Sequence, residues 1–294
     1  MQKYYPSISI VIPTYKSEKV LPICLQGIKN QNYPADGYEV LVVNNGSLDN
    51  TAKISKRYGI KVIEVSGKAP QTCVQRNAGE RAAKNEYVMY LDHDMELSPN
   101  LLKDFASAVS ETRGLVDAWY VPEKILASTS LFSKVRTFER SFYDGTIVDA
   151  ARIIKKSTIK KYNLQYDTNL SNGPADWDLD IQLKRNRCSF SIIHECIYHH
   201  EEHLSFWKYV GRKHMYADGI NFYIDKWKSR DMKVFKSTVS KQFGFGYRLF
   251  GVFVEDGKWN KVLSNPFLFV LVMTMKVLMF SIYVVKATIL KHVL

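Results

Sequence analysis

The chain has 294 residues, of which 46% are hydrophobic, so it is too apolar for a disordered protein and long enough for one large or two modest domains. Its formal net charge of +12 predicts a polyanionic partner, namely nucleic acid, an anionic membrane surface or a phosphorylated substrate, unless the charge only solvates the surface. The 4 cysteines show no Cys-x-x-Cys spacing, which argues against a zinc ribbon or a disulfide scaffold and favours a reducing compartment.

The first ninety or so residues alternate between buried strands and helices. Apolar runs predict strands at 8–12, 38–43, 60–65 and 87–91, and helical spacing predicts helices at 20–28, 51–58 and 78–83. This order predicts an open, mostly parallel sheet with right-handed crossovers, flanked by helices. A ligand of such a sheet lies across the carboxyl ends of its strands. The polar turns that fall on this edge are Thr14-Tyr15, Asn44-Asn45, Arg76-Asn77 and Asp92 to Asp94.

Asp92 and Asp94 follow the buried strand 87–91 directly. Carboxylates in the crevice beyond strand ends suit a hard divalent cation, because Mg²⁺ and Mn²⁺ prefer oxygen ligands and substrate phosphates. A solvated turn is the plain alternative. No G-x-G-x-x-G follows the first strand, and G-x-x-x-x-G-K-[ST] is absent, so the usual dinucleotide and P-loop sites are not indicated.

The second part of the chain adds a helix after Ser98-Pro99, strands at 116–121 and 150–154, and a basic helix at 155–162. An aromatic, basic helix at 131–143 is either a core helix or a helix that contacts an acceptor or lipid. Asp176 precedes a helix in which Leu179 and Leu183 share a face, so it is either a functional carboxylate or a simple cap.

The segment 194–203 is dense in histidine and glutamate, but its spacing matches no zinc pattern, and Ile192 to Ile197 is expected to be a strand interior. Beyond it, 232–253 is amphipathic and basic. The apolar stretch that Pro266 opens carries only Lys276 as a charge before Lys286. It is long enough to span a membrane. It could instead lie in the interface or pack as a soluble helix. The excess of Lys and Arg before it predicts that the body lies on the cytoplasmic side.

Residues 7–100 resemble the amino-terminal half of a family-2 glycosyltransferase with the GT-A fold. Four stretches in the right order carry the resemblance: SIVIPTYKSEKVLPICLQGIKNQNYP, EVLVVNNGSLDNT, QRNAGERAAKNEYVMYLDHDMELSP and, later, GPADWDLDIQLKR. The resemblance implies a GT-A type, mostly parallel sheet flanked by helices, with a helical, membrane-associating C-terminal region. Residues 1–112 would be the nucleotide-sugar-binding half, 113–230 the acceptor and catalytic half, and 231–294 the C-terminal amphipathic and hydrophobic helices.

The resemblance implies a nucleotide-sugar donor whose nucleoside pocket is lined by Pro13, Thr14 and Tyr15. Asn44 stands where the family usually has an acid that contacts the base. An amide oxygen accepts a hydrogen bond from uracil N3–H, whereas a carboxylate matches the adjacent donors of guanine better, so UDP is favoured over GDP. Arg76 matches the arginine near the donor, with a surface ion pair as its alternative.

The same resemblance assigns the cofactor, Mn²⁺ or Mg²⁺, to Asp94, with Asp92 on the metal or its water or on the ribose. The family's frequent third acid is Met95 here. His200 is expected to complete the metal site, with His199 in reserve. The family pattern Glu-Asp-x-Asp-Leu makes Asp176 the catalytic base, with Asp178 in reserve, although Ala175 replaces the glutamate.

Together these residues predict an inverting, metal-dependent glycosyltransferase that uses a lipid-linked saccharide or polysaccharide precursor at the cytoplasmic face of a membrane. Arg212 and Lys213 are candidates for the donor pyrophosphate or for phospholipid. Transfer to a polyprenyl phosphate is an alternative that needs no base, because that acceptor is already ionised. A catalytically silent membrane adaptor with the same fold is another. No nucleic-acid recognition module is present in the sequence, so nucleic acid is not an expected partner.

Overall fold

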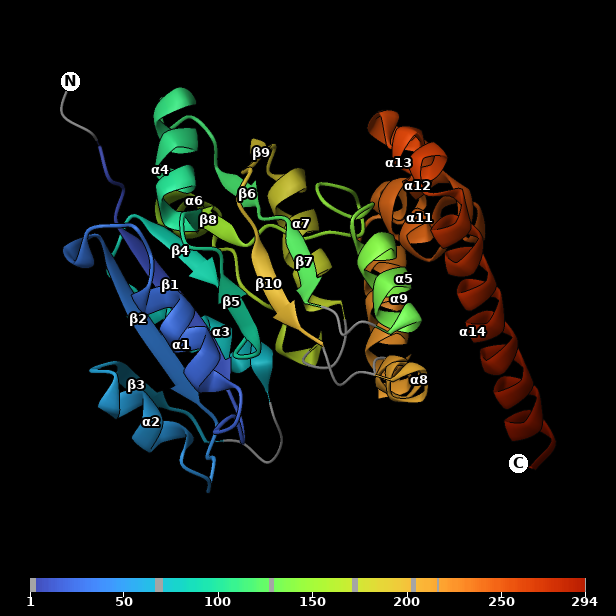
Figure 1. Ribbon diagram of the computed structural model, residues 1–294, viewed down its shortest axis with the longest axis horizontal. Coiled ribbons are helices and arrows are strands. Elements are labelled where there is room, and N and C mark those ends of the chain that lie inside the picture. Colours follow the sequence, from blue (N-terminus) through green and yellow to red (C-terminus); the bar gives the residue numbers. More distant parts are fainter. Residues whose placement is uncertain are drawn as a thin grey trace.

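A twisted seven-stranded sheet forms the centre of the protein, in the strand order β3-β2-β1-β4-β8-β6-β9 (Figure 1). The computed structural model describes residues 4–66, 71–126, 130–170, 174–201, 205–215 and 217–293. β1 pairs in parallel with β2 and β4, β2 with β3, and β6 with β9, whereas β8 is antiparallel to β4 and β6. The prediction of a mostly parallel sheet is therefore confirmed. The strands of this sheet are β1 (Ile8–Thr14), β2 (Tyr38–Asn44), β3 (Lys61–Glu64), β4 (Tyr87–Tyr90), β6 (Ala118–Tyr120), β8 (Ile153–Lys155) and β9 (Phe190–Ile192).

A second, three-stranded sheet has the order β5-β10-β7. Its strands are β5 (Met95–Leu97), β7 (Glu123–Leu126) and β10 (Ile197–His200). β10 is antiparallel to β5 and parallel to β7, with Met95 opposite His199. Because β5 follows β4 after a short turn, this small sheet carries histidines of β10 to the carboxyl end of β4 (Figure 1).

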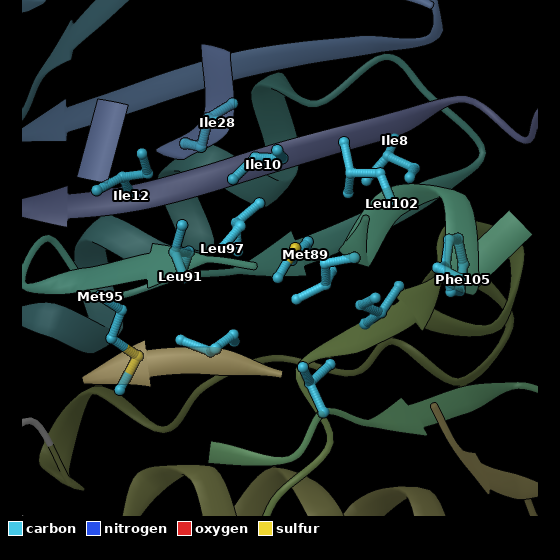
Figure 2. Close-up of a cluster of buried hydrophobic side chains, with 14 of the residues drawn as sticks. Ile8, Ile10, Ile12, Ile28, Met89, Leu91, Met95, Leu97, Leu102 and Phe105 are labelled. Carbon is cyan, nitrogen blue, oxygen red and sulfur yellow. The ribbon is translucent and has the colours of Figure 1, made fainter. Parts of the chain in front are cut away.

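Helices pack on both sides of the large sheet, as the alternating order predicts. In the amino-terminal half they are α1 (Leu21–Lys29), α2 (Thr51–Arg57), α3 (Thr72–Ala82) and α4 (Leu101–Glu111). One core cluster joins β1 and β4 to α1 and α4, and Figure 2 shows Ile10, Met89, Leu97 and Phe105 within it. α4 begins three residues after Ser98, slightly later than predicted.

Gly79 lets α3 lie directly against β1, because a Cβ at this position would collide with Val11 Cγ1. α3 therefore runs close beneath the strands, and Gln75 and Arg76, one turn earlier, reach the ends of β1 and β4. The Gln75 amide donates to the carbonyls of Thr14 (2.8 Å) and Val43 (2.7 Å), which ties the ends of β1 and β2 together.

The predicted strand through Ile192 to Ile197 is wrong. β9 ends at Ile192 and β10 begins at Ile197, in a different sheet. The chain turns between them because Asp104 Oδ2 accepts hydrogen bonds from the backbone N–H groups of His194 (2.7 Å) and Glu195 (2.8 Å). Buried Ile193 and Cys196 on either side of this turn give the sequence its strand-like appearance.

The remaining helices lie in the second half of the chain. They are α5 (Leu131–Arg140), α6 (Lys156–Tyr162), α7 (Ala175–Arg185), α8 (Phe206–Met215), α9 (Ala217–Arg230), α10 (Met232–Val234), α11 (Ser240–Phe243), α12 (Val252–Val254), α13 (Trp259–Ser264) and α14 (Pro266–Val293). The amphipathic segment 232–253 is divided into short helical pieces that include two π-helical turns, at Phe235–Val239 and Tyr247–Gly251.

α14 lies at the rim of the molecule and packs against α5 on one side only (Figure 1). Its single mid-helix charge, Lys276, is buried: Lys276 Nζ lies 3.2 Å from Glu139 Oε1 and donates to the Tyr143 hydroxyl at 3.1 Å. Within the described part of the chain, no helix combines the length and the apolar character needed to cross a membrane.

Candidate active site

The polar segments predicted to meet at one edge of the sheet do meet there, but Arg76 and Asn77 lie within helix α3 and not in a turn. Arg76 connects the turn after β4 to α7. Its guanidinium donates to Asp92 Oδ1 at 2.7 Å and to Asp176 Oδ1 at 2.5 Å. Asp92 follows β4 and Asp176 lies in α7, 100 residues from Arg76 in sequence. One buried guanidinium thus separates the predicted donor carboxylate from the predicted catalytic base.

Tyr166 gives Asp176 a second partner. The Tyr166 hydroxyl donates to Asp176 Oδ1 at 3.1 Å, and the Arg76 guanidinium lies 4.9 Å from the centre of the Tyr166 ring. Asn77 holds Tyr166 in place by a reciprocal pair of hydrogen bonds, 2.8 Å to its carbonyl and 2.9 Å from its backbone N–H. Sequence reasoning missed Tyr166, which carries no motif and lies in an irregular segment.

Asp176 does not precede its helix, because α7 begins at Ala175 and Asp176 lies in its first turn. The structure corrects the prediction of Asp178 as the reserve base, because Asp178 is fully buried and faces away from the site. Trp227 Nε1–H donates to Asp178 at 2.9 Å, and Lys226 Nζ lies 2.8 Å from the same oxygen. Two residues along a helix turn a side chain by about 200°. Asp178 therefore attaches α9 to α7 and cannot reach an acceptor that touches Asp176.

The two candidate histidines of β10 point to different partners. His199 Nε2 lies 3.4 Å from Asp94 Oδ2, whereas His200 Nε2 lies 3.0 Å from Glu96 Oε2. Successive side chains of a strand face opposite sides, so only one of them can face Asp94. The preference for His200 over His199 is therefore reversed: His199 is the histidine that the fold presents to the predicted metal ligand.

A chain of buried charges connects these groups. Arg152, one residue before β8, lies 3.1 Å from Asp92 Oδ2 and 3.5 Å from Glu123 Oε2. Glu123, the first residue of β7, also lies 2.9 Å from His199 Nδ1 and 3.1 Å from Arg140 Nη2. Sequence reasoning missed all three residues. The available signal was a single charge beside an apolar strand, at Arg152 after Ala151 and at Glu123 after Pro122.

These contacts shift the pKa values in the directions that the charges require. Burial alone would raise the pKa of Asp92, but the facing guanidinium groups of Arg76 and Arg152 outweigh it and lower that pKa well below its usual range. Burial alone would lower the pKa of His199, but its contacts with Asp94 and Glu123 raise that pKa to about 10. The two guanidinium groups therefore hold Asp92 ionised.

The predicted nucleoside pocket lies at the ends of β1 and β2. Pro13 O lies 3.2 Å from His93 Nδ1, the buried Thr14 hydroxyl donates to the Val43 carbonyl at 3.3 Å, and Tyr15 is partly exposed. Asn44 Nδ2 donates to Glu64 Oε2 at 2.9 Å, while Asn44 Oδ1 is buried and has no hydrogen-bond partner among the residues that the structure describes. An orphaned buried acceptor is rare in proteins and points to a ligand that donates to it.

The site offers two protein ligands to a divalent cation, Asp94 and His199. No cluster of three ligating side chains occurs among the described residues. Two ligands still fit Mg²⁺ or Mn²⁺, because such ions keep several waters and are shared with substrate phosphates. The side chains of Arg212 and Lys213, the candidates for the pyrophosphate, lie outside the described part of the chain.

Comparison with known proteins relates the first half of the chain to a known family. Residues 9–146 match the family model described as Glycosyl transferase family 2. This region belongs to glycosyl transferase family 2. It contains the predicted nucleoside turn, Arg76, Asp92, Asp94 and Glu123, whereas Asp176 and His199 lie beyond it. The family-2 resemblance deduced from the sequence motifs is therefore confirmed.

A curated relative and two solved structures extend the family-2 match. The poly(ribitol-phosphate) beta-N-acetylglucosaminyltransferase TarS of Staphylococcus aureus is 31% identical over 107 residues, which are 35% of this chain and 19% of TarS. The crystal structure of S. aureus TarS 1–349 in complex with UDP-GlcNAc has a TM-score of 0.53 and 18% identity, and covers 73% of this chain and 66% of that one.

The mannosyltransferase PcManGT from Pyrobaculum calidifontis, in complex with GDP-Man and Mn²⁺, has a TM-score of 0.59 and 14% identity, and covers 90% of this chain and 76% of that one. At such identities the structural likeness shows the fold, which is consistent with the GT-A type. The chain spans about a fifth of the length of its curated relative TarS.

Proposed function

We propose that this protein is an inverting glycosyltransferase that moves a sugar from a nucleoside diphosphate to a hydroxyl of a glycan or lipid-linked saccharide. The observation that carries the proposal is the position of Asp176, one guanidinium away from Asp92. A base that deprotonates the acceptor must lie within reach of the sugar that the donor side holds.

Asp176 is suited to the role of base because its two protein partners contact the same carboxylate oxygen. Arg76 and Tyr166 both contact Oδ1. Oδ2 is then the oxygen that takes the proton of the acceptor hydroxyl. As that proton moves, the acceptor oxygen attacks the anomeric carbon and the bond from that carbon to the diphosphate breaks on the opposite face, so the configuration inverts. A bound Mn²⁺ or Mg²⁺, held by Asp94 and His199, would offset charge on the departing diphosphate.

Asn44 favours a uridine donor. The carboxylate of Glu64 only accepts hydrogen bonds, so the Asn44 amide must turn Nδ2 toward it and present Oδ1 elsewhere. Oδ1 is the orphaned acceptor described above, and uracil N3–H is a single donor that suits it. The name of TarS, an N-acetylglucosaminyltransferase, and its complex with UDP-GlcNAc agree with this choice, while the complex of PcManGT holds GDP-Man.

The acceptor we favour is a hydroxyl of a glycan or of a polymer precursor. The name of TarS gives a poly(ribitol-phosphate) acceptor, and the basic charge of this chain suits an anionic polymer or lipid-linked saccharide. A polyprenyl phosphate would make a base unnecessary, and the placement of Asp176 beside the donor carboxylate favours the hydroxyl acceptor over it.

A panel of UDP- and GDP-sugars, each with and without Mn²⁺ or Mg²⁺, tests the donor assignment by the rise in melting temperature that a ligand of the folded state produces. We expect a UDP-sugar with metal to stabilise most. Slow metal-dependent hydrolysis of that same sugar would exclude a silent adaptor. If no nucleotide sugar stabilises the protein, the proposed function is wrong.

We also propose that the enzyme works at the cytoplasmic face of a membrane, with α14 on the lipid. One face of α14 packs on the protein through Val272 and Met275. The opposite face exposes an apolar stripe, α14's outer stripe, formed by Phe267, Val270, Val277 and Leu278 at the spacing of one helix face. Residues 231–294 carry 9 Lys or Arg and 3 Asp or Glu, a net charge of +6, which suits anionic lipid headgroups.

Sedimentation with phosphatidylglycerol vesicles tests this location. We expect binding to these vesicles, weaker binding to phosphatidylcholine, and a loss of at least about tenfold when Val270→Glu places a charge in the outer stripe. Leu115→Glu is the control, because Leu115 is also apolar and exposed but lies between α4 and β6, far from α14 (Figure 1). Equal weakening by both substitutions, or no vesicle binding by the wild type, would contradict the proposed location.

A further inference from the structure

The imidazole of His199 lies between two carboxylates, one from β7 and one from the turn before β5. Its Nδ1 is 2.9 Å from Glu123 Oε1, and its Nε2 is 3.4 Å from Asp94 Oδ2. The two nitrogens lie on opposite edges of the ring, so a contact at Nδ1 determines the direction in which Nε2 points. Glu123 therefore decides whether Nε2 meets Asp94.

Glu123 is itself held in one orientation, because its two oxygens have different partners. Oε1 faces His199, while Oε2 lies 3.1 Å from Arg140 Nη2 and 3.5 Å from Arg152 Nη2. β7 and β10 are parallel neighbours with Glu123 opposite Ile197, which places His199 two residues further along the same side of the sheet. The carboxylate is nearly buried, so few other rotamers are open to it.

We propose that Glu123 is a positioning residue for the metal of this enzyme. By accepting the Nδ1–H of His199, it makes Nε2 and Asp94 Oδ2 a preformed pair of ligands for a divalent cation that is shared with the donor diphosphate. This inference rests on the proposed function. A histidine that binds a metal commonly donates its other ring N–H to a carboxylate, and loss of that carboxylate typically weakens metal binding about 10–100-fold.

A simpler role for Glu123 has to be distinguished from the positioning of His199. Glu123 could serve only to neutralise Arg140 and Arg152, in which case His199 would be a bystander. Asp144 provides the comparison, because its carboxylate also lies near Arg140, at 3.4 Å from Nη1, and it has no contact with His199 among the described residues. Asp144 Oδ1 also accepts a hydrogen bond from the backbone N–H of Glu123 at 3.4 Å, and an asparagine keeps this acceptor. Asp144→Asn therefore removes the charge beside Arg140 and keeps Glu123 against His199.

The experiment is a calorimetric titration of Mn²⁺ into the full chain saturated with UDP, for the wild type, Glu123→Gln, His199→Ala, the double variant and Asp144→Asn. We expect Glu123→Gln to weaken Mn²⁺ binding about tenfold and Asp144→Asn to leave it unchanged. Because Glu123 acts through His199, adding Glu123→Gln to His199→Ala should produce little further loss. UDP affinity without metal should be the same in all five proteins.

Three results would overturn the proposal. The first is unchanged Mn²⁺ affinity in Glu123→Gln. The second is full additivity of the two substitutions, which would mean that Glu123 acts elsewhere. The third is a wild type that binds UDP but not Mn²⁺, which would leave the glycosyltransferase assignment intact and remove the metal. If Glu123→Gln does not fold, Glu123→Asp decides the matter, because it keeps the negative charge beside Arg140 and Arg152 but shortens the reach to His199 Nδ1, so it must weaken Mn²⁺ binding if Glu123 positions the histidine. Failure of the wild type to bind any nucleotide would instead contradict the proposed function.

Discussion

Two networks of paired charges, one at the strand ends and one between α5 and α14, differ in how far they are exposed. The strand-end network consists of Asp94, His199, Glu123, Arg152, Asp92, Arg76 and Asp176. The helix network consists of Arg136, Glu139, Tyr143, Glu201 and Lys276. Both place cationic groups against carboxylates, and both were assembled from segments far apart in the sequence.

The difference lies in exposure. In the strand-end network the carboxylates of Asp92, Asp94 and Asp176 keep 27%, 30% and 39% of their side-chain surface exposed. In the helix network Glu139 and Lys276 keep 4% and 11%. Open carboxylates can exchange a protein partner for a cation or a substrate, whereas a sealed pair can only hold its elements together. The same chemistry therefore leaves carboxylates open to a ligand in one place and attaches α14 in the other.

The sharpest test of the open network is Asp176→Asn. A general base typically contributes 10²–10⁴-fold, so we expect a loss of about 10³-fold in the rate of sugar transfer, with donor binding unchanged. The measurement is initial velocity with the preferred UDP-sugar, alongside a thermal melt with UDP. Asp178→Asn, two residues along, should instead lower the melting temperature. Undiminished turnover in a folded Asp176→Asn protein would remove this residue from the mechanism.

For the sealed network, Lys276→Met should reduce stability without affecting chemistry. Burial lowers the pKa of Lys276, and the charge persists because Glu139 faces it. Removing one partner of a buried pair costs about 3–5 kcal/mol, and we expect about 3 kcal/mol here because Arg136 still compensates Glu139. Denaturant unfolding measures the loss. A large fall in transfer rate per folded molecule would mean that the two networks are coupled.

The nucleoside end of the open site is tested by Asn44→Asp. A carboxylate at this position suits the donors of guanine better than uracil, so we expect the ratio of UDP to GDP affinity to fall about tenfold, or about 1.4 kcal/mol. Competitive binding of the two nucleotides gives the ratio. Asn45→Asp adds the same charge one residue later and should leave the ratio nearly unchanged. An unaltered ratio in Asn44→Asp would show that the base is read by another group.

The smallest effect is expected at Asp144, on the border between the networks. Burial raises its pKa to about 6, although Arg140 opposes the shift. A carboxyl with a raised pKa in the folded protein stabilises it at low pH, and this contribution is lost as the pH rises from about 4 through about 6. Asp144→Asn should therefore gain on the order of 1 kcal/mol relative to the wild type at pH 7.5 and nothing at pH 4. Denaturant melts at the two pH values measure it, and a pH-independent difference would contradict this reasoning.

Local sequence determined the elements of this fold and the positions of the polar turns. Strand and helix periodicities depend on neighbouring residues, so the strands at 8–12, 38–43 and 87–91 and the turns that follow them could be predicted. The family pattern also allowed Asp176 to be predicted, because the spacing of Asp176, Asp178 and Leu179 matches the pattern even though Ala175 replaces its glutamate. Whether that carboxylate acts as the base stays a prediction, and so do the metal, the uridine donor and the membrane.

Only the tertiary structure decided which side chains meet. Arg76 and Asp176 are 100 residues apart, and Glu123 and His199 are 76 apart, so their contacts depend on strand order and on the pairing of β7 with β10. A shift of one residue in a strand turns every side chain to the other face, which is why the sequence favoured His200 although His199 is the histidine that faces Asp94. The environment of Lys276 was likewise decided by the tertiary structure. An apolar helix has the same sequence pattern in lipid and in a protein core, and only the contact of Lys276 with Glu139 places its charge against the protein.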